Sequence, residues 1–388
     1  MSDTYLRRAT VDLAAYRANL VALQRLIEPA ELMAVVKANG YGHGATTMAA
    51  AAVDAGVRWL GALELANAHE LRAAGIGDGV AIFAWQFSPH ETFERAVSER
   101  IDLGISTLRQ LEAVAAAVRS VASAAAPDAP AFAALDAAAL VHLNVDTGLH
   151  RDGALATEWS EIVTRAVSLR EEGILRLRGA YSHLAEASDD EDTSSADALA
   201  RAIDEAEALG ARFERRHLTA SSAGMERPEL RLDMVRMGSN TYGIPVTDGV
   251  SAADRGLTPV LTLSARIARV KRIAAGTGVS YDYTFRAPRD TTVALVPIGY
   301  ADGIPRRSQN GCSVAVRGHR YPIVGRVAMD QFLIDVGDDP IEVGDEATLF
   351  GTGSSGELTV GEWADLIGTI GEELCSGLGP RIPRVYVG

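Results

Sequence analysis

The sequence predicts an α/β protein, with an N-terminal (β/α)8 barrel of the TIM type followed by a C-terminal, mainly β domain. Three observations predict this fold class. Short β-rich runs recur eight times in the first part of the chain, helix-favouring segments lie between them, and the alternation stops near residue 255. The 388 residues leave room for two or three domains. We expect the barrel in residues 1–255 and the β domain in residues 256–388, with the first residues able to pair with the β domain.

The eight runs have the apolar character of buried parallel strands. Most are mixed or continuous apolar runs rather than strict alternations, as expected for strands covered on both faces. They are Leu32–Val36, Arg58–Leu63, Val80–Trp85, Ile101–Ile105, Val141–Val145, Arg178–Ser182, His217–Ala220 and Met234–Gly238. Examples of the helix-favouring segments between them are Ala45–Ala55, Thr107–Val118, Thr157–Glu172 and Asp197–Arg216. An open doubly wound sheet is the rival fold, but the G-x-G-x-x-G of its dinucleotide-binding version is missing after the first strand.

Two stretches interrupt the alternation, and beyond the barrel the pattern changes. We interpret the Ala/Pro-biased residues Ala122–Ala139 as a helix end with a surface connection. The acidic run Glu186–Asp192 is interpreted as a solvated loop. After residue 255, turn signals separate strands expected at Thr258–Val270, Thr291–Pro297, Ser313–Arg317, Phe332–Val336 and Ala347–Phe350. One helix is expected at Val360–Ile367.

Composition and charge exclude several classes of protein. The chain has 37 Lys and Arg against 51 Asp and Glu, a net charge of −14. This balance argues against a nucleic-acid binder with a broad basic surface and against docking on anionic lipid. The N-terminus lacks the apolar core of a secretory signal, and the longest uncharged stretch, Ala38–Val53, is too short to span a bilayer. Two cysteines are too few for a thiolate zinc site. We expect a cytoplasmic protein with no membrane partner, no nucleic-acid partner and no metal.

The ends of the predicted barrel strands carry the candidate chemistry, because barrel sites lie at the C-terminal ends of the strands. Lys37 follows the first strand, in a low-dielectric mouth that favours a neutral, nucleophilic amine. Schiff-base chemistry with a carbonyl substrate or with pyridoxal phosphate is the natural use. The plain alternative is a rim lysine that extends to water.

Other strand ends add an anion site and two more side chains. Ser222, Gly238 and Ser239 follow the seventh and eighth strands, where such barrels usually bind phosphate, although ordinary turn chemistry explains these residues equally well. Arg151 and His183 follow the fifth and sixth strands and would face the same mouth. We interpret the other histidines considered, His43, His142 and His217, as structural.

Taken together, these motifs resemble the alanine racemase family, whose members combine a barrel with a β domain. The resemblance covers essentially the whole chain. It rests on AVVKANGYGHG (34–44), VDTGLHR (145–151), YSHLAEA (181–187), RMGSNTYG (236–243), GVSYDYTFR (278–286), VPIGYADGIPR (296–306) and GRVAMDQ (325–331). Seven segments in the correct order are far more specific than any one of them.

Carried over residue by residue, the resemblance implies pyridoxal 5'-phosphate as the cofactor. It implies that Lys37 holds the cofactor, that Arg236 donates to its pyridine nitrogen and that His183 lies against its ring. The further cofactor residues that it implies are Tyr41, Trp85, Ser222, Gly238 and Ser239, and all of these except Trp85 would hold the phosphate.

The resemblance also implies the substrate site and a homodimer. Arg151 would reach the phenolic oxygen of the cofactor and the substrate carboxylate. Met329 would contact that carboxylate through its backbone amide, and Tyr300 and Asp330 would line the entrance. In the family, residues of the β domain reach the barrel of the other subunit, so two shared sites are implied.

The implied reaction interconverts L-alanine and D-alanine by transfer of protons at opposite faces of the cofactor-bound substrate. Lys37 would serve one face and Tyr281 the other. An ordinary tyrosine titrates near pH 10, so one that acts as a base near neutrality needs a neighbouring cation or donor. The family implies that the product supplies D-alanine for cell-wall synthesis.

Three positions depart from the family pattern. Asn144 stands where the family usually has a lysine, commonly carbamylated, that orients Arg151. Either the Asn144 amide holds Arg151 directly, or an anion such as chloride replaces the missing carboxylate, and we predict the anion. Direct contact between the two side chains would contradict this. Pro380 precedes Arg381 where the family often has a phosphate-binding tyrosine, and Asp282 follows Tyr281 where the family prefers glycine.

Three other functions remain open from the sequence. The first is a racemase of broader specificity, or one for serine or another amino acid, motivated by Asn144 and Asp282. The second is a non-enzymatic protein that binds pyridoxal phosphate, which needs Lys37 but no β domain carrying Tyr281. The third is a fold-related decarboxylase, whose substrate cysteine and glycine-rich phosphate loop are not evident.

Overall fold

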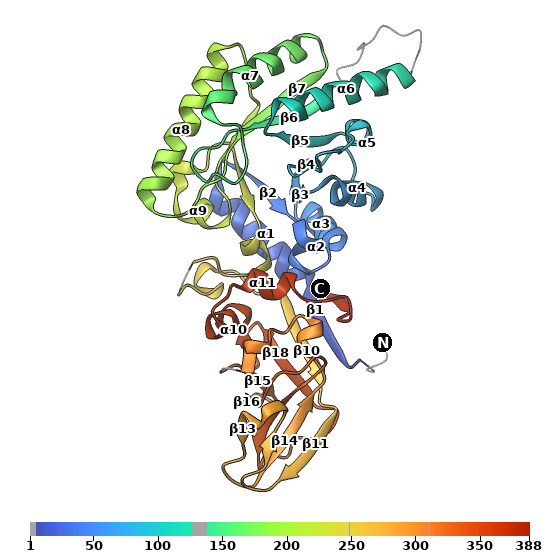
Figure 1. The fold of residues 1–388 in the computed structure, drawn as a ribbon, viewed down its shortest axis with the longest axis vertical. Helices are drawn as coiled ribbons and strands as arrows, with labels where there is room; N and C mark the ends of the chain where they lie inside the picture. The colour runs from blue at the N-terminus through green and yellow to red at the C-terminus, as the bar shows by residue number, and fades with distance from the viewer. Residues whose placement is uncertain (1–4, 126–137, 248, 310) are drawn as a thin grey trace. The chain divides into compact units, whose positions relative to one another are not determined.

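The computed structural model describes residues 5–125, 138–247, 249–309 and 311–388. Figure 1 labels the helices and strands. The chain forms two compact units that interleave along the sequence. The barrel unit comprises Leu20–Lys37 and Ala52–Gly238, and the β unit comprises Met1–Asn19, Ala38–Ala51 and Ser239–Gly388.

The barrel unit contains a closed barrel in which each strand pairs in parallel with the next and β9 closes on β2. Its strands are β2 (Glu31–Val35), β3 (Trp59–Leu63), β4 (Ala81–Ala84), β5 (Ile101–Ile105), β6 (Ala139–Asn144), β7 (Leu175–Tyr181), β8 (Arg215–His217) and β9 (Met234–Met237). The predicted barrel is therefore confirmed. The prediction for β8 was displaced, because the strand ends at His217. Beyond it, the Thr219 carbonyl still accepts a hydrogen bond from the Arg236 amide, at 3.1 Å.

Helix α7 of the barrel unit buries one apolar stripe. In α7 the buried residues Trp159, Ile162, Val163, Ala166 and Leu169 recur at the three- and four-residue steps of one helix face. Figure 1 shows helices α4 to α8 outside the strands. The helices up to residue 226 are α1 (Leu13–Ile27), α2 (Lys37–Tyr41), α3 (Ala45–Asp54), α4 (Leu65–Ala73), α5 (Glu94–Ser98), α6 (Leu108–Ala125), α7 (Ala156–Glu171), α8 (Asp189–Ala208) and α9 (Ser221–Glu226).

Helix α8 corrects two expectations about its ends. The acidic run was predicted as a loop, but Asp189–Asp192 form the first turn of the helix. Carboxylates are favourable there because they face the positive end of the helix dipole, and Ser188 caps the helix by accepting from the Glu191 amide at 3.2 Å. The helix ends at Ala208 rather than near residue 216, since Gly210 takes a φ of 98° just beyond the end. Of the stretch 122–139, α6 covers 122–125, and residues 126–137 lie outside the described residues.

The β unit is built on one large sheet with the order β11-β14-β17-β16-β15-β18-β10-β1-β20, with β19 beside β18. The N-terminal β1 pairs antiparallel with β10 and parallel with β20. The strands are β1 (Arg7–Asp12), β10 (Leu261–Arg266), β11 (Arg269–Ile273), β12 (Gly278–Val279), β13 (Phe285–Arg286), β14 (Thr291–Val296), β15 (Ser313–Val316), β16 (His319–Val324), β17 (Phe332–Gly337), β18 (Glu346–Gly351), β19 (Leu358–Thr359) and β20 (Arg384–Val387).

The predicted C-terminal helix and strands are present, with three differences. Helix α10 spans Val360–Ile367, as predicted, and is followed by α11 (Gly371–Ser376), which the sequence reasoning missed. The run predicted as one strand at 258–270 is divided into β10 and β11. The missed strand β16 has an alternation of exposed and buried residues that Pro322 obscures in the sequence.

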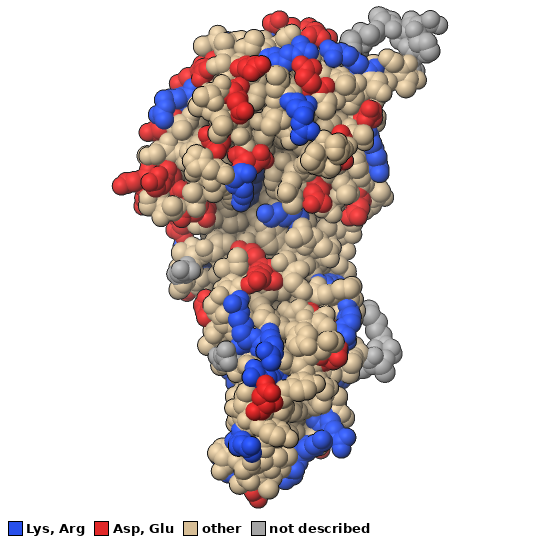
Figure 2. All heavy atoms as spheres, in the orientation of Figure 1, with Lys and Arg blue, Asp and Glu red and all other residues tan. Residues whose placement is uncertain are grey.

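The surface carries charges of both signs. Figure 2 shows basic and acidic side chains interspersed on the face that it displays. Among the described residues, no helix is both long and apolar enough to cross a membrane.

Ser188→Ala should lower the free energy of unfolding by about 1 kcal/mol, because the Glu191 amide loses its acceptor at the start of α8. Urea unfolding followed by far-UV circular dichroism measures the change. Ser123→Ala is the matched control, since the Ser123 hydroxyl only bonds back to the Arg119 carbonyl within α6. The control should shift stability by less than about 0.5 kcal/mol. Equal losses in the two variants would contradict the capping role of Ser188.

Candidate active site

Lys37 lies two residues beyond β2, where the chain enters a left-handed turn. Ala38, Asn39 and Gly40 have φ values of 51°, 55° and 61°, and Tyr41 continues the turn with 52°. A left-handed conformation costs a residue with a Cβ roughly 1–2 kcal/mol. Such runs persist only where the surrounding contacts impose them, and they are concentrated at functional sites.

The contacts that impose this turn lie within the β unit. The Asn39 carbonyl accepts from the Gly44 amide at 2.8 Å, and the Asn39 side chain accepts from the Ala45 amide at 3.0 Å. Gly42 has a φ of 81°, and a Cβ there would lie 1.9 Å from the carbonyl oxygen of Cys375. The backbone around Tyr41 is therefore held in one conformation.

Tyr41 and Ser239 lie beside each other in the β unit. The Tyr41 ring is tilted against Tyr242, with the centroids 5.0 Å apart. Burial, together with the charge of Glu372, raises the pKa of Tyr41 to about 12, so its phenol stays protonated and can donate. The Ser239 hydroxyl donates to a Glu372 carboxylate oxygen at 2.6 Å. These two predicted phosphate residues are thus a pair of neighbouring hydroxyl groups.

Arg236 extends from β9 into the barrel interior and is only 7% exposed. Its Nη1 lies 2.9 Å from Nδ1 of His217. Its Nη2 donates to the carbonyls of Ser182 and Leu218, both at 2.8 Å, and lies 2.9 Å from Nδ1 of His183. Burial lowers the pKa of Arg236 to about 10, and the guanidinium remains charged at neutral pH.

Positive charges converge on His183, which follows β7. Burial and then the charges of Arg236, Arg151 and Lys37 lower the pKa of His183 to about 3. His183 is therefore neutral at physiological pH. The charges of three cations of the barrel unit, one within β9 and two beyond β2 and β6, thus act on one imidazole. An anion with more than one charge suits such a site.

The segments after β8 and β9 are connected by a serine that sequence reasoning missed. The Ser221 hydroxyl accepts from the Gly238 amide at 2.9 Å, while the predicted Ser222 is half-buried at the second position of α9. Two adjacent serines differ only in the direction that the local backbone gives them, so the sequence offers no signal to separate them. Trp85 follows β4 and stacks on Phe83, with the centroids 5.3 Å apart.

Asn144 is the last residue of β6, and Arg151 lies beyond the strand. The Asn144 amide donates to the Ser106 hydroxyl at 3.1 Å, and Asn144 is buried. Among the described residues, Asn144 and Arg151 make no hydrogen bond with each other, and Arg151 is exposed. An anion between them therefore stays a prediction.

The candidate residues of the β unit are exposed. Tyr281, Met329 and Tyr300 are 69%, 53% and 44% exposed. Tyr300 and Met329 are neighbours, because the Ala301 amide donates to the Met329 carbonyl at 2.9 Å. Asp330 accepts from Arg381 at 2.7 Å. Large apolar and aromatic side chains that are exposed together are typical of a surface that binds another molecule.

The backbone at Asp282 explains why glycine suits this position. Asp282 has a φ of 59°, which costs little for glycine and is tolerated by aspartate better than by most residues. Its carboxylate lies 2.6 Å from Nε of Arg326. This ion pair places a charge beside Tyr281 that glycine would not provide.

The fold and the site together define a class of enzyme. A lysine after the first strand of a (β/α)8 barrel, beside two arginines and a neutral histidine, is typical of an enzyme that holds an anionic cofactor on its lysine. Among the described residues, no group of three or more His, Cys, Asp or Glu side chains is placed to bind a metal ion.

Comparison with known proteins gives the family. The profile described as "Alanine racemase, N-terminal domain" matches residues 11–245, and "Alanine racemase, C-terminal domain" matches residues 260–386. The chain is 43% identical to the alanine racemase of Streptomyces coelicolor, covering 100% of this chain and 97% of that protein. It is 39% identical to that of Thermobifida fusca, covering 98% of each. The crystal structure of alanine racemase from Streptomyces lavendulae superposes with a TM-score of 0.93 at 38% identity, over 99% of this chain and 98% of that one. The chain belongs to the alanine racemase family.

His43 makes the stability of the protein depend on pH. It is fully buried in the β unit, and burial lowers its pKa to about 4 from an ordinary 6.5. Between these values the unfolded chain binds a proton that the folded chain does not, so stability falls as the pH falls from 6.5 towards 4. The contribution of His43 approaches about 1.4 kcal/mol per pH unit.

His43→Asn and His43→Gln should both reduce the pH dependence of the free energy of unfolding between pH 4.5 and 6.5 by that amount, whatever they do to stability at pH 7.5. Urea unfolding at a series of pH values measures this slope. A slope equal to that of the unmodified protein in either variant would contradict the assignment of a neutral His43.

Proposed function

We propose that the protein interconverts L-alanine and D-alanine with pyridoxal 5'-phosphate, using Lys37 and Tyr281 as the two groups that move protons. Membership of the alanine racemase family carries the activity, and the enzyme is an isomerase. The observation that carries the site is the contact of Arg236 Nη2 with Nδ1 of the neutral His183, at 2.9 Å, while the charges of Arg151 and Lys37 also lower the pKa of this imidazole. The relatives compared above are named alanine racemases, which supports alanine over the broader specificity considered from the sequence.

The residues present fit the cofactor. Pyridoxal phosphate carries a phosphate, a phenolic oxygen and an aldehyde, and the mouth of the barrel offers cations and one lysine amine. Lys37 would bind the aldehyde carbon, and Arg236 would donate to the pyridine nitrogen. Tyr41 would donate to the phosphate, with Ser222, Gly238, Ser239 and Trp85 as further contacts. When bound, the cofactor supplies the electron withdrawal that acidifies the hydrogen on Cα of the substrate.

The chain's own residues then decide where protons go. The Lys37 amine takes or returns a proton on one face of the substrate, and the Tyr281 phenol does so on the other. His183, neutral because of burial and its cationic neighbours, would lie beside the cofactor without adding charge. Arg236 has only donors and keeps its proton, so it would hold the pyridine nitrogen as an unprotonated acceptor.

The substrate carboxylate needs a cation and a neutral donor. Arg151 provides the cation, and the Met329 backbone amide provides the second contact, while Tyr300 and Asp330 line the entrance. Among the residues that the structure describes, Arg151 makes no ion pair with a carboxylate, and the Asn144 side chain has no amine that could be carbamylated. A bound chloride beside Asn144 would supply that negative charge.

The exposure of Tyr281, Met329 and Tyr300 supports a homodimer in which these residues complete the site of the partner subunit. A proton-transferring phenol that is 69% exposed in one chain lacks the water-excluded surroundings that proton transfer on a substrate needs. A second copy of the chain can supply those surroundings. The product, D-alanine, would serve cell-wall synthesis in the cytoplasm.

Racemisation tests the function directly. The purified protein with pyridoxal phosphate should convert L-alanine to D-alanine, detected by a D-amino-acid oxidase. Lys37→Ala should lose the visible absorbance of the bound cofactor and lower kcat by at least about 100-fold, since one proton-transfer group is lost. Arg58→Ala, outside the site, is the control and should change neither. A Lys37→Ala variant with full activity, or faster turnover of serine or lysine than of alanine, would overturn the proposal.

Complementation tests the shared site. Lys37→Ala and Tyr281→Phe should each be inactive alone, but co-expression should restore about a quarter of normal activity, because half of randomly formed dimers are mixed and each has one intact site. The specific activity of the co-purified mixture measures this. If both residues of a site came from one chain, the mixture would stay inactive.

A further inference from the structure

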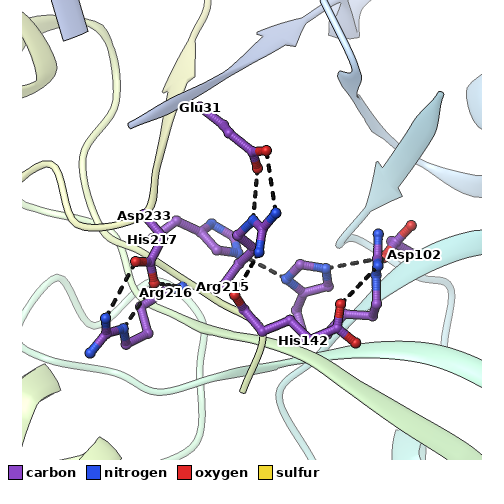
Figure 3. A network of polar contacts seen from close by, with 9 residues as sticks. Glu31, Asp102, His142, Arg215, Arg216, His217 and Asp233 are labelled. Atoms are coloured by element: carbon purple, nitrogen blue, oxygen red, sulfur yellow. Dashed lines mark hydrogen bonds and ion pairs between the residues drawn. The ribbon is translucent and has the colours of Figure 1, made fainter. Parts of the chain in front are cut away.

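We propose that Asp102 is a positioning residue that sets the orientation of Arg236 through His142 and His217. Asp102 is the last acceptor of a chain of hydrogen bonds in which each side chain donates to the next. The chain lies entirely within the barrel unit, and Figure 3 shows Asp102, His142 and His217 in line. The inference rests on the proposed function only in its last step, which is the contact of Arg236 with the cofactor ring.

The geometry links four side chains from four strands. His142 Nε2 lies 3.2 Å from Asp102 Oδ1, and His142 Nδ1 lies 3.0 Å from His217 Nε2. His217 Nδ1 in turn lies 2.9 Å from Nη1 of Arg236. Asp102, His142 and His217 have no exposed surface. Water therefore cannot substitute for a missing partner along this chain without entering the packed barrel interior.

Arg236 determines the direction of the chain. A guanidinium has only hydrogen-bond donors, so Nδ1 of His217 must be unprotonated and accept a hydrogen bond from Arg236. Burial, and then the charge of Arg236, lowers the pKa of His217 well below its usual value, so the ring is neutral and carries its proton on Nε2. That proton points at His142 Nδ1, which must also be bare.

The other end of the chain matches this direction. A neutral His142 with a bare Nδ1 carries its proton on Nε2, which faces Asp102 Oδ1. An ionised carboxylate has only acceptors, so the two ends of the chain impose the same direction. Every hydrogen bond runs from Arg236 towards Asp102. The same logic leaves Nδ1 of His183 bare, because Nη2 of Arg236 faces it.

A second role of Asp102 has to be separated from this one. Asp102 Oδ1 also lies 3.0 Å from Nε of Arg178, which pairs with Glu214 through Nη1 at 3.0 Å. This ion pair places a cation against the buried carboxylate. Among the described residues, Oδ2 of Asp102 has no hydrogen-bond partner. Oδ1 alone therefore serves both the ion pair and the histidine chain.

Loss of the Asp102 carboxylate would change the position of Arg236 at the cofactor site. Without it, the Nε2 hydrogen of His142 would be buried and unsatisfied, which favours moving the proton to Nδ1. His217 would then have to carry its own proton on Nδ1, directed at the hydrogens of Arg236. Arg236 would turn away, and its remaining hydrogens would leave the position from which they reach the pyridine nitrogen.

The first test needs no variant of Asp102 and no cofactor chemistry. Two-bond ¹⁵N–¹H correlation spectra of the purified protein report which nitrogen of each of its eight histidines carries hydrogen. Signals of His142 and His217 are assigned by their loss in His142→Gln and His217→Gln. Both rings should be neutral with the proton on Nε2. A proton on Nδ1 of either ring, or a doubly protonated ring, would overturn the proposal.

A matched pair of variants then separates the acceptor from the ion pair. Asp102→Asn and Asp102→Leu both remove the charge that faces Arg178, but only Asp102→Asn keeps an acceptor oxygen for His142. In Asp102→Asn, His142 and His217 should both keep the proton on Nε2. The Kd of pyridoxal phosphate should stay close to that of the unmodified protein. In Asp102→Leu, the protons of His142 and His217 should move to Nδ1, and the Kd of pyridoxal phosphate should rise roughly tenfold or more. This is the size of effect seen when a metal-ligating histidine loses its outer hydrogen-bond partner. Equal effects of the two variants would show that only the charge matters and would overturn the proposal.

Should Asp102→Leu not fold, His142→Phe replaces it. This change cuts the chain in the middle and leaves the ion pair of Asp102 with Arg178 intact. Phenylalanine suits a position whose ring already packs on Phe83 and Trp59. The Kd of pyridoxal phosphate should again rise roughly tenfold, and an unchanged Kd would contradict the proposal. Failure of the unmodified protein to bind pyridoxal phosphate would instead contradict the proposed function, while the tautomer measurement would still stand.

Discussion

Arg236 places a positive charge inside the barrel, where only 7% of its surface is exposed and its direct partners are two carbonyls and two histidines. A buried charge without an opposite charge in contact costs several kcal/mol, so the surroundings must be arranged to tolerate it. The carbonyls and the bare imidazole nitrogens do so by accepting hydrogen bonds. Both histidines must then stay neutral. The protonation of the barrel interior thus follows from one arginine.

The net charge of the chain and the charge at the mouth of the barrel have opposite signs. The chain as a whole carries −14, and its acidic and basic side chains are mixed on the displayed surface (Figure 2). The barrel mouth is nevertheless cationic, because the charges of Lys37, Arg151 and Arg236 act on His183. Net charge describes how the surface meets solvent and other macromolecules, whereas a small anionic ligand responds to the few charges that surround it. A negative protein can therefore hold a phosphate ester and a carboxylate.

Much of the fold was predictable because its signals are local. Buried parallel strands are short apolar runs, and seven of the eight, from β2 to β7 and at β9, were placed within three residues at each end. The predictions that were wrong depended on context. The first acidic turn of α8 is stable only because Ser188 caps it and the helix dipole attracts its carboxylates, and β16 forms only because neighbouring strands pair with a run that contains Pro322.

For the site, the sequence alone determined the fold class, the family resemblance and the residue types at the strand ends, because these are written in short motifs of fixed spacing. Tertiary structure decided which of those residues meet. Asp102, His142, His217 and Arg236 lie on four strands, far apart in the sequence, and no spacing rule relates them. The direction of their hydrogen bonds follows from donors and acceptors at distances of 2.9–3.2 Å, and such distances exist only once the barrel has closed.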